Sequence, residues 1–221
     1  MSGALEGIRV LEIASYVTGP FASMLLADLG AEVIKVEQPK QGDPFRGWGE
    51  KLYSGTFCSL NRNKKSVTLD LRHDEARDIA FKLAARSDVL IENFRPGTLE
   101  KHGLGYDTVR RLNPKIIYCS ISGFGQSGPY RDLPGYDTVG QAMSGLLSLC
   151  TDSEKPHGMG ISFSDHLTGI YACYGVLGAL VNRGITGEGQ QVETSLLRAS
   201  VSFVSENAVR YFETGVVPRR A

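Results

Sequence analysis

The sequence predicts an open, doubly wound α/β fold with a mostly parallel sheet, and three observations carry this prediction. Short apolar segments rich in Val, Ile and Leu alternate with longer helical patterns along most of the 221 residues. Such alternation is typical of parallel strands joined by crossover helices. Hydrophobic residues make up 42% of the chain, enough for a substantial core. The first 37 residues already hold a strand–helix–strand unit, which implies a right-handed crossover.

That first unit is delimited by proline and glycine. Residues 8–13 are predicted to form a strand, and Pro20 favours a helix start because proline is preferred at the first helical position. The helix, residues 21–29, ends at Gly30, and a second strand follows at residues 32–36. A polar, Gly-rich excursion over residues 38–55 then holds Trp48, the only tryptophan.

The middle of the chain continues the alternation. Residues 66–71 are predicted to form a strand, and residues 74–87 an amphipathic helix that turns Ile79 and Leu83 inward. A short buried strand at residues 89–91 precedes a helix at 106–112 and a strand at 115–121. The later elements are a helix at 136–149, a strand at 190–194 and a long helix at 196–214.

Between these last elements, the segment from residue 170 to 181 is apolar except for its tyrosine hydroxyls. Small residues recur along it, which predicts a helix buried on nearly all sides. Ser164 or Asp165 is expected to cap this helix, and Gly184 and Gly187 to end it. Free N–H groups and the helix dipole are expected to stabilise Asp165 as the anion. The local pattern alone favours a plain cap over a nucleophile, although the two roles are compatible.

Charge and cysteine usage exclude several classes of protein. Lys plus Arg and Asp plus Glu both number 24, so no net field favours nucleic acid or an acidic membrane. The four cysteines form no CxxC pair and the four histidines are scattered, which argues against a metal site or a disulfide framework. The N-terminus lacks the features of a signal peptide, and the apolar segment after Asp165 is too short for a bilayer. We therefore expect a cytoplasmic protein.

Three further stretches allow two interpretations each. The segment 123–128 matches GxGxxG, but prolines follow where a dinucleotide fold needs a helix, so we interpret it as a loop. The segment 93–97 is an ordinary turn, or else Phe94 and Arg95 offer a stacking face and a phosphate partner. A basic cluster is a solvated face or a phosphate site. Its members are Arg62, Lys64, Lys65 and Arg72.

Several stretches, present in one order along the chain, carry a wider resemblance. They are residues 5–12, 19–20, 28–37, 42–44, 63–71, 92–97, 165–169 and 187–190. Together they resemble the class III CoA-transferases, the family of formyl-CoA transferase and the carnitine-CoA transferase type. The resemblance implies that residues 1–221 are the N-terminal part of a Rossmann-like large domain, without the family's small domain and C-terminal return. It also implies a homodimer, interlocked when full length.

The resemblance assigns the chemistry to Asp165, which falls where the family's aspartate forms acyl and CoA intermediates. It implies an acyl-CoA and a small carboxylic acid as substrates, with no permanently bound cofactor. The positions expected to contact CoA are Val17, Thr18, Leu69, Asp70, Leu71, Arg72, Asn93, Phe94, Arg95, Lys101 and Tyr136. Val17 stands where formyl-CoA transferase has a glutamine, which disfavours a formyl/oxalate pair.

Two alternatives stay open. The family also contains α-methylacyl-CoA racemases, which carry a histidine base in a Gly-His-Asp stretch. This chain has Gly135-Tyr136-Asp137 there, so a racemase is the weaker interpretation. The second alternative is a truncated, non-catalytic paralogue that binds CoA.

Overall fold

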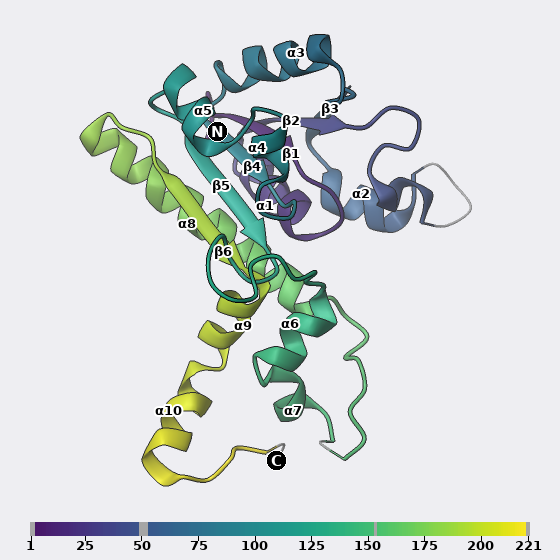
Figure 1. The fold of residues 1–221 in the computed structure, drawn as a ribbon, viewed down its shortest axis with the longest axis vertical. Coiled ribbons are helices and arrows are strands. Elements are labelled where there is room, and N and C mark those ends of the chain that lie inside the picture. Colours follow the sequence, from purple (N-terminus) through teal and green to yellow (C-terminus); the bar gives the residue numbers. More distant parts are fainter. Residues whose placement is uncertain (1–2, 49–52, 153, 220–221) are drawn as a thin grey trace.

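Six parallel strands form the central sheet of the molecule (Figure 1). The computed structural model describes residues 3–48, 53–152 and 154–219. In these residues the sheet has the order β3-β2-β1-β4-β5-β6, and every pairing within it is parallel. The strands are β1 (Arg9–Ile13), β2 (Glu32–Glu37), β3 (Lys64–Thr68), β4 (Val89–Glu92), β5 (Ile117–Ser122) and β6 (Gln191–Ser195). The predicted fold class is confirmed.

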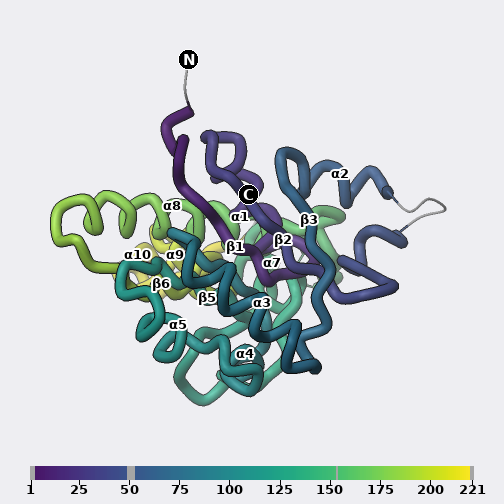
Figure 2. Tube along the Cα trace, turned by 90° about the horizontal axis from the view of Figure 1, so that it is seen from above, coloured from purple at the N-terminus to yellow at the C-terminus, as the bar shows by residue number. Residues whose placement is uncertain are grey.

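Helices cover both faces of the sheet (Figure 2). One face packs against α1 (Thr18–Asp28) and α8 (Phe163–Thr186). The other packs against α3 (Asp74–Ala84), α4 (Thr98–Lys101) and α5 (Tyr106–Leu112). Successive residues of one strand serve opposite cores: Val10 faces α1 and α8, whereas Leu11 faces the other layer. This arrangement explains why the central strands β4 and β5 are buried at every position rather than at alternate ones.

Several predicted boundaries need correction. Helix α1 begins two residues before Pro20, and β3 begins two residues and ends three residues earlier than predicted. The short 3₁₀ helix η1 (Pro44–Gly47) and the helices α2 (Gly55–Asn61) and α4 were not predicted. On α3, Leu83 packs inward but Ile79 is exposed, because the buried face of the helix is centred on Ala80 and Ala84. Small residues, invisible to a search for large apolar ones, set this contact.

Two predicted helices are each divided. Gly145 takes a left-handed φ of 82° and separates α6 (Asp137–Met143) from α7 (Leu146–Cys150). The predicted helix 196–214 breaks around Val204 into α9 (Leu196–Phe203) and α10 (Ser205–Thr214). Figure 1 shows these four helices beyond the lower end of the sheet, where β5 and β6 point.

Helix α8 differs from its prediction in two ways. Its N-cap is Ser162, whose side chain makes no capping bond, so neither Ser164 nor Asp165 is the cap. One side of the helix is also exposed, through an outer stripe made of Ile170, Tyr174, Val181 and Ile185. The prediction that Gly187 ends the helix is confirmed, because Gly187 is its C-cap and has a positive φ. The prediction for Gly184 is wrong, because Gly184 lies inside the helix. None of the described helices is long and apolar enough to cross a membrane.

A buried ion network holds the excursion after β2 against the sheet. Lys35 Nζ lies 2.5 Å from Glu12 Oε1 and 2.9 Å from Asp43 Oδ2, and Lys64 Nζ lies 2.8 Å from Glu12 Oε2. All four side chains are at most 2% exposed. Burial alone would raise the pKa of Glu12, but the two ammonium groups hold it below its ordinary value. Two positive and two negative charges therefore balance inside the fold.

Candidate active site

A cavity of about 860 Å³ opens at the carboxyl ends of the strands. Its floor includes Ile13 at the end of β1 and Ile121 near the end of β5, and residues that follow β4 form one wall. The chain order along the sheet reverses between β1 and β4, and crevices at such a switch point bind ligands in open α/β sheets. The volume lies within the range usual for small-molecule sites.

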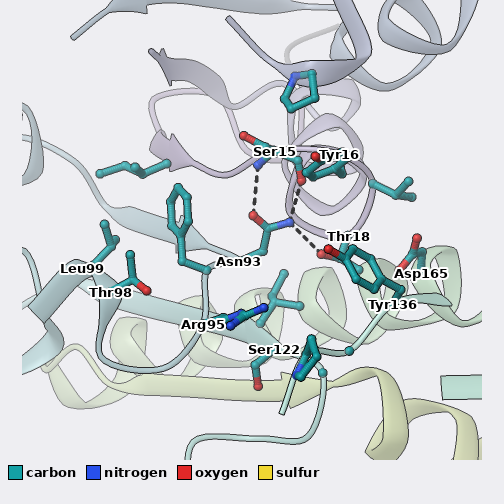
Figure 3. Close-up of a pocket in the computed structure, with 18 of the residues that line it drawn as sticks. Ser15, Tyr16, Thr18, Asn93, Arg95, Thr98, Leu99, Ser122, Tyr136 and Asp165 are labelled. Atoms are coloured by element: carbon teal, nitrogen blue, oxygen red, sulfur yellow. Dashed lines mark hydrogen bonds between the residues drawn. The ribbon is translucent and has the colours of Figure 1, made fainter. Parts of the chain in front are cut away.

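Asn93 joins the two loops on either side of this switch point (Figure 3). Its side-chain oxygen accepts the Ser15 N–H at 3.0 Å, and its amide nitrogen donates to the Ser15 carbonyl at 2.7 Å and to Thr18 Oγ1 at 3.0 Å. These bonds fix the loop after β1, in which Tyr16 takes a strained φ of 66°. Of the predicted contacts, Asn93, Val17 and Thr18 therefore share one wall of the cavity.

The segment after β3 forms a second wall. Leu69, Asp70, Leu71 and Arg72 all line the cavity. Arg72 is bound by Asp70, through Nε–Oδ1 at 2.8 Å and Nη2–Oδ2 at 2.7 Å, so part of its charge is already compensated. Lys101 is exposed at the end of α4 and does not line the cavity. Its contact with CoA stays a prediction.

Phe94, Arg95 and Tyr136 complete the predicted set around the cavity. Arg95 has no ion-pair partner among the described residues, and Figure 3 shows its side chain within the cavity's lining. Tyr136 is 69% exposed, so its ring is available to a ligand. Phe94 and Arg95 both line the cavity, so the turn at 93–97 brings an aromatic ring and a cation to the site.

The basic cluster is for the most part not a phosphate site. Arg62 is paired with Asp28, Lys65 is paired with Glu32, and Lys64 belongs to the buried network. Only Arg72 of the four lines the cavity. Sequence proximity placed these residues together, but the strand β3 turns alternate side chains to opposite sides.

Asp165 lies in the first turn of α8 and lines the cavity. The helix comes close to the start of α1 here: a methyl group at Gly169, one turn on, would lie 3.0 Å from the Thr18 carbonyl oxygen. No described residue donates a hydrogen bond to the Asp165 carboxylate. Burial and the nearby Asp137 raise the pKa of Asp165 to about 7. The expected stabilisation of the anion by the helix end is therefore wrong.

The helix end serves Asp137 instead. The Asp165 N–H donates to Asp137 Oδ1 at 3.1 Å, and Gln141 Nε2 donates to Asp137 Oδ2 at 2.5 Å. Asp137 had no predicted role, because this contact spans 28 residues of sequence and depends on how α6 and α8 pack.

An aromatic wall was also missed. Tyr16, Phe45 and Trp48 line the cavity, with ring centroids 5.6 Å apart for Tyr16 and Phe45 and 4.6 Å apart for Phe45 and Trp48. The buried ion network positions this wall, because Asp43 Oδ1 accepts the Phe45 N–H at 3.0 Å. Tryptophan in a polar, Gly-rich excursion was the available signal. No group of three or more potential metal ligands gathers among residues 3–48, 53–152 and 154–219.

Comparison with known proteins gives one consistent result. Residues 5–221 match the model of CoA-transferase family III. The chain is 42% identical over 220 residues to a succinyl-CoA–D-citramalate CoA-transferase of Chloroflexus aurantiacus, covering 98% of this chain and 55% of that protein. It is 41% identical over 211 residues to the mouse succinyl-CoA:glutarate CoA-transferase, covering 94% and 48%.

A solved structure shows the same fold. A CaiB/BaiF family protein from Brucella suis superposes with a TM-score of 0.95 at 38% identity, over 100% of this chain and 60% of that one. The chain thus spans about half the length of the curated relatives it matches.

Proposed function

This chain belongs to CoA-transferase family III, and from that premise we propose that it transfers CoA from an acyl-CoA to a carboxylic acid through a covalent intermediate on Asp165. One observation carries the proposal. The Asp165 carboxylate lines the switch-point cavity and receives no hydrogen bond from a described residue, so its lone pairs are available to a substrate.

A carboxylate nucleophile conserves the energy of the thioester. An Asp165 oxygen attacks the thioester carbonyl carbon, the C–S bond breaks, and a mixed anhydride and CoA thiolate result. The thiolate then attacks the aspartyl carbonyl carbon, which releases the donor acid as its carboxylate and leaves an aspartyl-CoA thioester. The acceptor carboxylate attacks that thioester to form a second anhydride, and the returning thiolate completes the new acyl-CoA and restores Asp165. No water enters any step, so the site must exclude it.

The cavity offers suitable groups for CoA. The cations Arg72, Arg95 and Arg131 line it and match the charge of a phosphate. The N-terminus of α1 also faces it, and the Val17 cap leaves helix N–H groups without a side-chain acceptor. Apolar and aromatic residues, among them Phe94, support binding of the less polar portions of the ligand.

The relatives suggest where to look for substrates. Relatives matched at about 40% identity are named for succinyl-CoA together with D-citramalate, glutarate or mesaconate. We therefore propose succinyl-CoA and a small dicarboxylic acid as the first pair. The intact protein, incubated with succinyl-CoA and a panel of acids, should form a new acyl-CoA detectable by mass. CoA binding without any exchange would instead favour the non-catalytic paralogue.

A racemase remains the second candidate, because a carboxylate with a pKa near 7 also suits a general base. However, Tyr136 occupies the family's histidine position, so the histidine base of the racemases is not present there. We expect the intact protein to exchange no α-proton of a 2-methylacyl-CoA in deuterated water. Mass spectrometry of the recovered thioester tests this, and rapid deuterium uptake would overturn the choice of transferase.

The homodimer expected from the resemblance is also a proposal, supported by the outer stripe of α8. Tyr174 and Ile185 are 74% and 81% exposed, and an apolar stripe along a long helix typically packs against another polypeptide. We propose a second copy of the chain as the partner.

Replacing both Val181 and Ile185 with glutamate is expected to prevent the intact protein from assembling into a dimer as it folds, because charges cannot be buried without partners. Sedimentation velocity provides the measurement. The matched control is Ile79→Glu, which changes an exposed isoleucine on α3 and should leave the dimer intact. An unchanged sedimentation coefficient in the double variant would contradict this interface.

A further inference from the structure

The N-terminus of α8 is capped from outside, by a side chain on another helix. Ser162 makes no capping bond, and Asp137, the first residue of α6, accepts the Asp165 N–H at 3.1 Å. The bond requires α6 and α8 to approach closely, and Gly140 permits this, since a methyl group there would lie 3.2 Å from Ser164 Cβ. Ser164 Oγ in turn lies 2.8 Å from Ser200 Oγ on α9, so the helix start is held from both sides.

A buried glutamine fixes the orientation of Asp137. Gln141 is 1% exposed, and its amide nitrogen donates to Asp137 Oδ2 at 2.5 Å and to the Ile161 carbonyl at 3.3 Å. Both oxygens of Asp137 therefore accept hydrogen bonds, whereas those of Asp165 receive none from a described residue. The two carboxylates are thus unequal: Asp137 is solvated by the protein and Asp165 is not.

We propose that Asp137 is a positioning residue for Asp165. Asp137 fixes the backbone that carries the nucleophile, and its negative charge favours the acylated form of Asp165 over the free carboxylate. This inference rests on the proposed function. A purely structural cap would account for the hydrogen bond alone, and a neutral acceptor such as asparagine would serve equally well. The charge is what distinguishes the two roles.

The negative charge of Asp137 matters because acylation removes the negative charge of Asp165. When an Asp165 oxygen attacks the thioester carbonyl, the C–S bond breaks and the thiolate carries the negative charge away. The side chain changes from anion to uncharged anhydride while Asp137 keeps its charge. A fixed neighbouring anion therefore destabilises the reactant and not the acylated product. Protonation removes the same charge, and the pKa of Asp165 is accordingly raised to about 7 by burial and by Asp137.

Few other ionisable groups reach this pair. On α8, His166 is the neighbour whose charge lowers the pKa of Asp137, and its Nδ1 donates to the Ser162 carbonyl at 2.7 Å. The remaining contacts to Asp137 come from Gln141 and from the backbone at Ser164 and Asp165. Burial nonetheless raises the pKa of Asp137 above its ordinary value.

The decisive variant is Asp137→Asn in the intact protein. Its carboxamide oxygen can still accept the Asp165 N–H, and its N–H groups can donate to the Gln141 side-chain oxygen, which is buried and has no partner among the described residues. The fold is thereby kept while the charge is removed. The pKa of Asp165 should fall by about one unit, observed by ¹³C NMR of labelled aspartate carboxyls, with the Asp165 signal assigned from its loss in Asp165→Asn.

The same variant should lower the equilibrium ratio of acylated to free Asp165 about tenfold, because one pKa unit corresponds to a tenfold change in an equilibrium constant. Asp137→Ala, which also removes the acceptor, should lower the acylation rate further. The matched control is Asp107→Asn, an exposed acidic residue in the first turn of α5, which should change neither quantity.

The outcomes separate this inference from the proposed function. If wild type forms the Asp165 adduct but the titration and the acylated fraction are the same in Asp137→Asn, Asp137 is only a cap and the inference is overturned. If wild type forms no adduct at Asp165, the proposed function fails with whatever depends on it. A lower Asp165 pKa together with less adduct supports the inference.

Discussion

Replacing Asp165 with alanine in the intact protein is expected to abolish CoA exchange, by a factor on the order of 10⁴ or more, because no other described carboxylate at the cavity stands free of donors. CoA affinity should remain within about threefold of wild type. The groups proposed to hold CoA, among them Arg95 and the N-terminus of α1, lie on other elements. Exchange is followed by the mass of the new thioester, and affinity by calorimetric titration with CoA.

Asp165→Asn adds a test of the electrostatics. The folded state binds a proton at Asp165 up to a pH of about 7, whereas an unfolded chain releases it near 3.8, so stability is lost as pH rises between these values. Asparagine has no such loss. The variant should therefore be inactive yet more stable than wild type at pH 8, by about 1–3 kcal/mol, and the difference should disappear towards pH 4. Urea denaturation at several pH values measures this, and an equal or lower stability at pH 8 would contradict the raised pKa.

The second large effect concerns the fold. Glu12→Ala leaves Lys35 and Lys64 buried with only Asp43 to balance them, and breaking a buried network in this way costs about 3–5 kcal/mol. For a domain of this size the melting temperature should fall by roughly 10 °C. The loss should be accompanied by weaker CoA binding, because Asp43 also positions the aromatic wall through Phe45.

Glu32→Ala is the matched control for Glu12→Ala. Both glutamates lie on neighbouring strands and each contacts two basic side chains, but Glu32 pairs with Arg9 and Lys65 at the surface. Its loss should cost far less stability than the loss of Glu12, because solvent screens exposed ion pairs. Denaturant unfolding of the two variants side by side tests the difference. Equal losses would show that burial of the network does not matter to stability.

The sheet and its helical layers were predictable, whereas the way helices meet was not. Alternation of apolar segments is a local pattern, and it located the strands to within a few residues. The breaks at Gly145 and Val204, and the close approach of α3 through Ala80 and Ala84, depend on neighbours far along the chain. The exposed stripe of α8 illustrates the same limit, because an apolar sequence does not tell whether its cover lies within the chain.

The candidate site was predicted unevenly for the same reason. Strand ends and the resemblance placed Asn93 and Asp165 at the cavity, where the structure has them. The raised pKa of Asp165 was missed, because it comes from burial and from Asp137 across a packing contact between two helices, and neither is visible in the local sequence. Asp43 likewise looks like a surface turn residue until Lys35 is seen beside it.

The central claim, that Asp165 is the covalent nucleophile, is tested most directly by trapping. The intact protein is incubated with succinyl-CoA, treated with hydroxylamine and digested, and the peptides are analysed by mass. Hydroxylamine cleaves the aspartyl anhydride or thioester and should leave a hydroxamate on Asp165 alone, dependent on succinyl-CoA and absent in Asp165→Asn. A hydroxamate on another residue, or rapid exchange with Asp165 unmodified, would contradict the account.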